Sequence, residues 1–136
     1  MRFERKIKVR MYDTDSAQIL FFGNQFRLIN DVFEDFLEEI GFGTRHLFKS
    51  DWGLVFVHAE SDYLSPSRVG DELTISLEIS KIGNTSFSVN YTLKREKDGT
   101  LVGTSKSSHV TISQKTMKKC NLPSNLKNKL LRYTSS

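Results

Sequence analysis

The sequence predicts an α+β domain in which a five-stranded antiparallel sheet packs against one long helix. Apolar and polar residues alternate near the N-terminus and again over residues 73–80 and 87–93, as in strands with one buried face. Between them, apolar residues recur every three or four positions, which is typical of an amphipathic helix. With 136 residues, 38% of them hydrophobic, residues 1–136 form one domain and leave no room for a second.

The first two elements follow from a change of period. Residues 6–11 alternate basic and apolar side chains and predict a strand. Residues 24–40 carry one wide apolar stripe opposite a charged face and predict the long helix. Asn24 is the expected N-cap, because its side chain can accept a hydrogen bond from a free N–H group. Gly41 is a suitable stop.

Four further strands complete the predicted sheet. They are expected over residues 54–64, 73–80, 87–93 and 101–112. Pro66 ends the first of these, since proline has no N–H for the ladder. Gly83-Asn84 and Asp98-Gly99 are turn pairs, so the last three strands should form two successive hairpins.

Charge is uneven along the chain. The net charge is +4, and residues 114–136 contain lysines and an arginine but no acidic residue. We interpret this segment as a basic C-terminal tail, partly frayed, with a helical turn near residues 126–131. It could also attract a phosphate-bearing ligand. No aromatic-and-basic motif accompanies it, so no nucleic-acid partner is expected.

Other classes of protein find little support. Cys120 is the only cysteine, which excludes an intrachain disulfide and suits a cytoplasmic protein. The chain lacks a secretory signal and a run of apolar residues long enough for a membrane span, so no membrane partner is expected. The histidines are scattered without ligand spacing, and no glycine-rich nucleotide motif is present. Neither a metal nor a cofactor is expected.

Residues 12–24 are the most informative stretch, because two carboxylates, Asp13 and Asp15, lie between the first strand and the helix. A loop at that junction can present a carboxylate beside the unpaired N–H groups that open the helix. Reactions at a carbonyl group need such a pair. Alone, however, an Asp-x-Asp before a helix is more often a capping or turn pair.

The stretch D-T-D-S-A-Q-I-L-F-F at residues 13–22 resembles the signature of hotdog-fold acyl-CoA thioesterases of the 4-hydroxybenzoyl-CoA thioesterase family. Two later segments are similar to other parts of that family: Y-L-S-P-S-R-V-G-D-E-L at residues 63–73, and H-V-T-I at residues 109–112 followed by Leu122-Pro123. Together they span most of the chain. The resemblance implies the hotdog fold, a five-stranded antiparallel sheet wrapped around one long helix.

By the same resemblance, the chain should hydrolyse an acyl-CoA thioester to a carboxylate and coenzyme A, which enters as part of the substrate. Asp15 is then the general base or the nucleophile, and the backbone amide of Phe22 stabilises the oxyanion. Asp13 is expected to hold the loop through hydrogen bonds. The acyl group is either aromatic, as in 4-hydroxybenzoyl-CoA or dihydroxynaphthoyl-CoA, or a short to medium aliphatic chain.

Further residues are expected to contact the substrate. These are Ala17, Ile19, Gly23, Asn24 and Arg68. Arg68 would bind the phosphates of coenzyme A. The sequence departs from the family pattern at Gln18, where many relatives have glycine, and at Gly23, where many have a larger residue.

Several alternatives remain open at this stage. The thioester could be carried by an acyl-carrier protein, whose acidic surface would suit the basic chain, or the domain could bind an acyl thioester or a protein without catalysis. His58 and Glu60, on a predicted strand, are rival bases. We expect a homodimer or homotetramer with the sites at the interface, because the resembling proteins join their sheets edge to edge.

Overall fold

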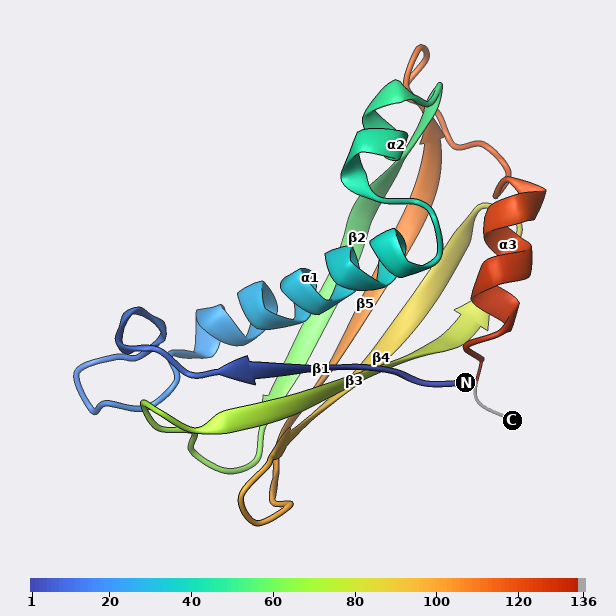
Figure 1. Cartoon of the computed structure of the whole chain (residues 1–136). Coiled ribbons are helices and arrows are strands. Elements are labelled where there is room, and N and C mark those ends of the chain that lie inside the picture. The colour runs from blue at the N-terminus through green and yellow to red at the C-terminus, as the bar shows by residue number, and fades with distance from the viewer. Residues whose placement is uncertain (135–136) are drawn as a thin grey trace.

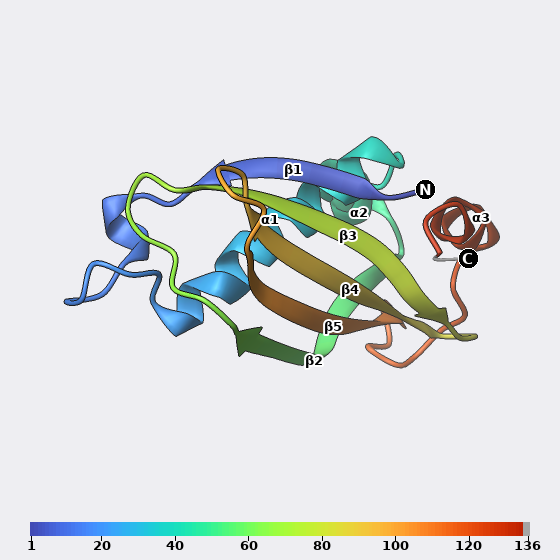
Figure 2. The ribbon, with the colours of Figure 1, turned by 90° about the horizontal axis from the view of Figure 1, so that it is seen from below.

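The computed structural model describes residues 1–134 and contains one five-stranded antiparallel sheet in the order β1-β3-β4-β5-β2. The strands are β1 (Phe3–Lys8), β2 (Trp52–Tyr63), β3 (Glu72–Ile82), β4 (Ser86–Arg95) and β5 (Leu101–Ser113). The long helix α1 (Phe22–Glu39) lies across one face of the sheet (Figures 1 and 2). The first two strands of the chain therefore form opposite edges of the sheet, and the predicted fold class is confirmed.

The core lies between α1 and the sheet, where alternation on the strands places every second side chain toward the helix. The apolar residues of this layer are at most 3% exposed: Leu28, Ile29, Val32, Phe33, Phe36 and Leu37 of α1, Leu73, Ile75, Leu77 and Ile79 of β3, and Phe87, Val89, Tyr91 and Leu93 of β4. Burying each large side chain contributes about 1.5–3 kcal/mol. This layer holds α1 in place above the sheet.

Strand β5 differs from its neighbours, because its inward residues are small or polar. They are Gly103, Ser105, Ser107, His109 and Thr111, all buried. Their polar groups need partners beneath the helix. The Ser107 hydroxyl meets the Tyr91 hydroxyl at 3.0 Å and the His109 Nε2 at 2.8 Å. A polar seam thus runs through the core toward the N-terminal half of α1.

The boundaries around the first loop differ from the prediction. Strand β1 ends at Lys8, and residues 11–13 form one turn of 3-10 helix. Helix α1 begins at Phe22 with Phe21 as its N-cap, so the prediction of Asn24 as the cap was wrong. The Asn24 side chain instead donates from Nδ2 to the Asp13 carbonyl at 2.8 Å. The side-chain amide of Asn24 therefore links helix α1 to the loop that precedes it.

Two short helices complete the fold. Helix α2 (Thr44–Lys49) follows α1 and was not predicted, because six residues are too few to show a helical period. Helix α3 (Ser124–Leu131) lies near the predicted helical turn. Within residues 1–134, no helix has the length and apolar character required to cross a membrane.

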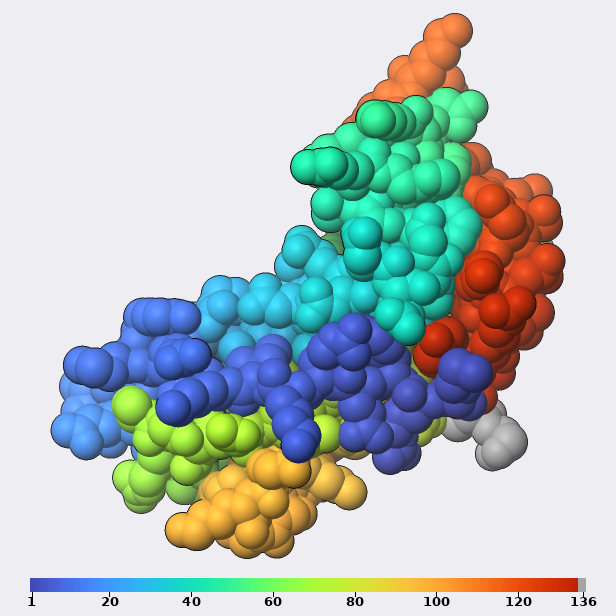
Figure 3. Space-filling model, viewed as in Figure 1, coloured from blue at the N-terminus to red at the C-terminus, as the bar shows by residue number. Residues whose placement is uncertain are grey.

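The C-terminal segment is docked against the body of the protein, and the prediction of a partly frayed tail was wrong for residues 122–133 (Figure 3). Leu126 and Leu130 are fully buried. The Tyr133 ring packs edge-on against Phe36 at 4.9 Å, and its carbonyl accepts a hydrogen bond from the Ile79 amide at 2.9 Å. Three apolar residues among the lysines therefore suffice to anchor this segment.

Candidate active site

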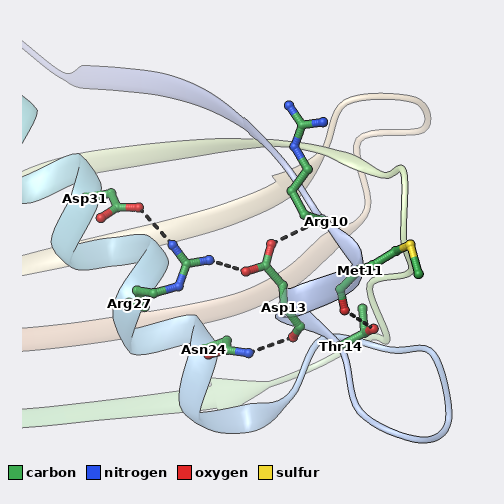
Figure 4. Close-up of polar contacts among 7 residues, drawn as sticks. All are labelled: Arg10, Met11, Asp13, Thr14, Asn24, Arg27 and Asp31. Atoms are coloured by element: carbon green, nitrogen blue, oxygen red, sulfur yellow. Dashed lines mark hydrogen bonds and ion pairs between the residues drawn. The ribbon is translucent and has the colours of Figure 1, made fainter.

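The loop before α1 is held by Asp13, which is 1% exposed. Its Oδ2 accepts the Arg10 amide at 2.8 Å, and its Oδ1 pairs with the guanidinium of Arg27 from α1 (Figure 4). Its carbonyl accepts the Phe21 amide at 2.9 Å and the Asn24 side chain. Oδ2 therefore fixes the start of the loop, while Oδ1 and the carbonyl tie the loop to the helix, which agrees with the structural role predicted for Asp13.

Asp15 begins a tight turn two residues later. Its carbonyl accepts the Gln18 amide at 2.9 Å, and its Oδ1 accepts the Ala17 amide at 2.9 Å. Gln18 has φ = 65°, in the left-handed region that favours glycine, which costs a non-glycine residue about 1 kcal/mol. The side chain of Asp15 is exposed, and no donor within residues 1–134 reaches its Oδ2. One carboxylate oxygen therefore orients the group while the other stays free.

Asp15 opens onto a cleft of about 500 Å³, which we call the loop cleft. It is lined by Asp15, Ile19, Leu20, Phe22, Gln25, Tyr63, Leu64, Ser65, Pro66, Ser67 and Val102. The turn is held against the segment after β2, because the Leu20 amide donates to the Ser67 carbonyl at 2.7 Å and Ile19 pairs with Arg68. The cleft therefore lies between the loop, the start of α1 and the end of β2.

Phe22 also lines this cleft. As the first residue of α1, it has no carbonyl one turn earlier in the helix to accept its N–H, and no acceptor within residues 1–134 bonds to it. The Tyr63 hydroxyl donates to the Phe22 carbonyl and fixes this residue. Burial raises the pKa of Tyr63 above its ordinary value of 10.0, which already keeps the phenol protonated as a donor at neutral pH.

Gln25, one turn further along α1, is a cleft residue that the sequence analysis did not identify. It is 1% exposed, and its Nε2 donates to the Ser105 hydroxyl at 3.0 Å and to two backbone carbonyls. A Cβ atom at Gly103 would lie 2.8 Å from its Oε1, so glycine is required for this close approach. The available signal was a polar residue one turn before Ile29 on the apolar stripe of the helix.

The predicted substrate contacts are distributed over this region. Ile19 lines the loop cleft, and Ala17 binds the Asp15 carboxylate. Gly23 and Asn24 lie in the first turn of α1, where Asn24 faces the Asp13 carbonyl. Arg68 is exposed and lies next to Ile19, with its amide donating to the Asp71 carboxylate at 2.9 Å. The fold thus brings two distant sequence segments, residues 15–24 and 63–68, to one place.

The rival bases lie elsewhere. His58 and Glu60 are exposed on β2 and approach each other at 3.7 Å. Glu60 lines a separate hollow with Asn90 and Lys106. Neither residue lines the loop cleft. In the part of the chain that the structure describes, no three His, Cys, Asp or Glu side chains are grouped closely enough to hold a metal ion.

Comparisons with known proteins agree on one family. Residues 9–130 match the model of the thioesterase-like superfamily. A 1,4-dihydroxy-2-naphthoyl-CoA hydrolase of Prochlorococcus marinus is 34% identical over 125 residues, covering 86% of this chain and 79% of that protein. The corresponding hydrolase of Acaryochloris marina is 30% identical over 128 residues, covering 93% of each.

Two solved structures show the same fold. A 1,4-dihydroxy-2-naphthoyl-CoA thioesterase from Synechocystis superposes with a TM-score of 0.90 at 23% identity, covering 96% of each chain. A Staphylococcus aureus protein solved in complex with CoA superposes with a TM-score of 0.92 at 21% identity, covering 100% of this chain and 87% of that one.

Proposed function

The chain belongs to the thioesterase-like superfamily of hotdog-fold thioester hydrolases, and from this membership we propose that it hydrolyses an aromatic acyl-CoA whose ring carries hydroxyl groups. Relatives that are at least 30% identical are named for 1,4-dihydroxy-2-naphthoyl-CoA. Of the acyl groups considered from the sequence, these names favour the dihydroxynaphthoyl group over 4-hydroxybenzoyl and aliphatic chains. The loop cleft, about 500 Å³ and lined largely by apolar residues, has a suitable size for an aromatic acyl group.

One observation supports the proposed chemistry: Asp15, whose Oδ2 has no donor within residues 1–134, and Phe22, whose amide has no acceptor there, line the same cleft. The Phe22 N–H would donate to the thioester oxygen and stabilise the negative charge that develops there. The positive end of the α1 dipole adds to this effect. The thiolate of coenzyme A, with a thiol pKa of about 8–9, leaves without a general acid.

Two routes use Asp15 in this geometry. As a general base, it removes a proton from a water molecule that attacks the carbonyl carbon. As a nucleophile, Oδ2 attacks the carbon and forms a mixed anhydride, which water then cleaves. A single turnover in ¹⁸O-labelled water identifies the nucleophilic route when the label enters Asp15. The base route puts ¹⁸O into the product carboxylate, whereas cleavage of the anhydride at its aspartyl carbonyl puts ¹⁸O into the enzyme.

Arg68 supports a role for coenzyme A at the rim of the site. Its side chain is exposed beside Ile19, which lines the cleft. A guanidinium at this place suits the phosphates of a nucleotide that extends into solvent while the acyl group enters the cleft. Ala17, Gly23 and Asn24 would shape the approach to Phe22 through the loop and the first turn of α1.

We also propose that the protein is a homodimer, or a tetramer built from such dimers. Strand β2 is an edge of the sheet, and an unpaired edge is a template for another strand. Apolar residues on it are unusually exposed: Val55 at 39%, Phe56 at 48% and Val57 at 59%. Pairing two β2 edges would cover these side chains and bring a second subunit close to the loop cleft at Tyr63.

Purified protein tests the function directly with a panel of acyl-CoAs and detection of the released thiol. We expect turnover of 1,4-dihydroxy-2-naphthoyl-CoA to exceed that of 4-hydroxybenzoyl-CoA and of aliphatic acyl-CoAs. Faster turnover of the same acyl group on an acyl-carrier protein would identify the carrier protein as the substrate. Failure to release thiol from every substrate would contradict catalysis and favour a binding domain.

A further inference from the structure

We propose that Gln25 is a specificity residue whose side-chain oxygen accepts a hydrogen bond from a ring hydroxyl of the acyl group. This inference rests on the proposed function and goes beyond it, since it assigns the recognition of one substrate group to one residue. It starts from the place of Gln25, which is 1% exposed, on α1, and part of the wall of the loop cleft.

The orientation of the Gln25 amide is determined by its neighbours. Its nitrogen lies 3.4 Å from the Asp62 carbonyl, 3.3 Å from the Thr104 carbonyl and 3.0 Å from the Ser105 hydroxyl. Backbone carbonyls only accept hydrogen bonds, so the atom that faces two of them must be the donor, Nε2. The other atom, Oε1, is therefore the oxygen.

Oε1 receives no hydrogen bond from any residue in the part of the chain that the structure describes. Among the described residues, His109 Nδ1 is the one fully buried side-chain N or O atom without a partner, so Oε1 keeps contact with solvent. A ligand that displaces this water must supply a donor in its place, or lose about 1–3 kcal/mol. The three bonds to Nε2 and the close approach of Gly103 keep the Gln25 amide in one orientation. This acceptor is held in place, and residues 1–134 supply no donor to it, so it is available to a ligand that carries one.

The chemistry of Oε1 excludes one obvious partner. The thioester oxygen and the oxyanion that forms from it are acceptors too, so they would be repelled by Oε1. They are matched by the N–H of Phe22. Gln25 must face a group that carries a hydrogen, and an aromatic acyl group offers one where its ring bears a hydroxyl.

The place of Gln25 along α1 decides which part of the substrate it meets. It follows Phe22 by three residues, on the same helix face and roughly 4.5 Å further along the axis. Phe22 is 62% exposed whereas Gln25 is 1% exposed, so this direction leads into the protein. With the thioester carbonyl at the Phe22 amide, coenzyme A extends outward and the acyl ring reaches Gln25.

The test compares substrates that differ by hydroxyl groups alone, such as 1,4-dihydroxy-2-naphthoyl-CoA and 2-naphthoyl-CoA. We expect the parent enzyme to prefer the hydroxylated substrate by about tenfold or more in kcat/KM, because the analogue leaves Oε1 unpaired. Equal kcat/KM for the two substrates in the parent overturns the proposal whether or not any variant folds.

Gln25→Met keeps the length of the side chain and removes the acceptor. We expect it to reduce the preference to within about threefold, mainly through loss of activity on the hydroxylated substrate. Ser105→Ala is the matched control: it removes one anchor of Nε2 and leaves Oε1. It should keep most of the preference. A purely structural role for Gln25 would lower the activity of both variants without changing the substrate ratio.

The outcomes separate the inference from the proposed function. A parent that releases no thiol from any acyl-CoA contradicts the function itself. A parent that prefers the hydroxylated substrate, with the same preference in Gln25→Met, leaves the function standing and overturns the role of Gln25. A loss of kcat by the same factor for both substrates in Gln25→Met alone, with Ser105→Ala unaffected, would mean that Oε1 binds the attacking water, which also overturns the proposal.

Discussion

At the scale of the residue, Asp13 and Asp15 show how surroundings divide two identical side chains. Asp13 is buried, and the Arg10 amide and the Arg27 guanidinium occupy both of its oxygens. Asp15 is exposed, and the Ala17 amide occupies only one. A group that must accept a proton or attack a carbon needs a free oxygen, so Asp15 is suited to chemistry and Asp13 to structure.

Asp13→Asn should therefore lower stability more than activity. Asparagine replaces one carboxylate oxygen by an NH₂ group, so a donor then faces either the Arg27 guanidinium or the Arg10 amide, which are donors too. We expect a loss of about 1–3 kcal/mol in the free energy of unfolding. Chemical denaturation measures this loss. The folded variant should retain kcat within about tenfold of the parent. A larger fall in kcat without a loss of stability would contradict the structural role.

His109 gives a prediction about pH. It is fully buried between the Phe33 and Phe87 rings, and burial lowers its pKa from 6.5 to about 4. Below pH 6.5 the unfolded chain binds a proton that the folded protein does not bind, so stability falls as pH drops from 6.5 toward 4. By pH 4.5 the loss from this residue should be about 2–3 kcal/mol relative to pH 7.

Comparing the parent with His109→Asn separates the pH dependence that His109 causes from the pH dependence that the carboxylates cause, because both proteins contain the same carboxylates. Unfolding free energies of both proteins at pH 7 and pH 4.5 give the pH-dependent loss of each. The variant starts less stable but should lose about 2–3 kcal/mol less on acidification. Equal losses in the two proteins would mean that His109 does not titrate as a buried neutral group.

At the scale of the element, the sequence predicted the helices and strands whose hydrophobic pattern or flanking turns are distinct, and it missed the short ones. Strands β1, β3 and β4 and helix α1 were predicted from regular alternation or a wide apolar stripe. Strand β2 was predicted from a mixed apolar run that ends at Pro66, and β5 from the turn before it. Helix α2 was missed because it is one and a half turns long, and α3 was assigned to a tail because lysines surround its few apolar residues. The start of α1 was misplaced because Asn24 has the typical chemistry of a cap but binds the Asp13 carbonyl.

Docking of α3 predicts a large effect from a single residue. Leu126→Ala removes a fully buried side chain and should lower the free energy of unfolding by about 2–5 kcal/mol. Leu131→Ala, in the same helix but with Leu131 51% exposed, is the control and should change it by less than about 0.5 kcal/mol. Equal small effects in urea denaturation would show that the segment is not part of the folded core.

At the scale of the molecule, the sequence predicted the fold and the place of the loop, but not the cleft. Asp15 and Phe22 were predicted as site residues from their motif, and both line the cleft. Gln25 was not predicted, because its place in the cleft depends on contacts with carbonyl groups of β2 and β5 that lie far away in sequence. The pairing of Ile19 with Arg68 likewise becomes visible only when the segment after β2 reaches the loop.

The proposed dimer can be tested at the β2 edge. Val57→Lys places a charge on a side chain that the partner should bury, and we expect sedimentation at micromolar concentration to show monomers. Val69→Lys changes an equally apolar, 44% exposed residue outside β2 and should leave the dimer intact. A parent that sediments as a monomer and still turns over substrate would rule out the dimer as a requirement for activity.

The most direct test of the account is the activity of Asp15→Asn in a thiol-release assay with 1,4-dihydroxy-2-naphthoyl-CoA. Asparagine keeps an oxygen for the Ala17 amide, so the unfolding free energy should stay within about 0.5 kcal/mol of the parent. It can neither take a proton from water nor attack as an anion, and kcat should fall by about 10² or more. A variant that folds normally and releases thiol as fast as the parent would contradict the assignment of Asp15 as the catalytic group.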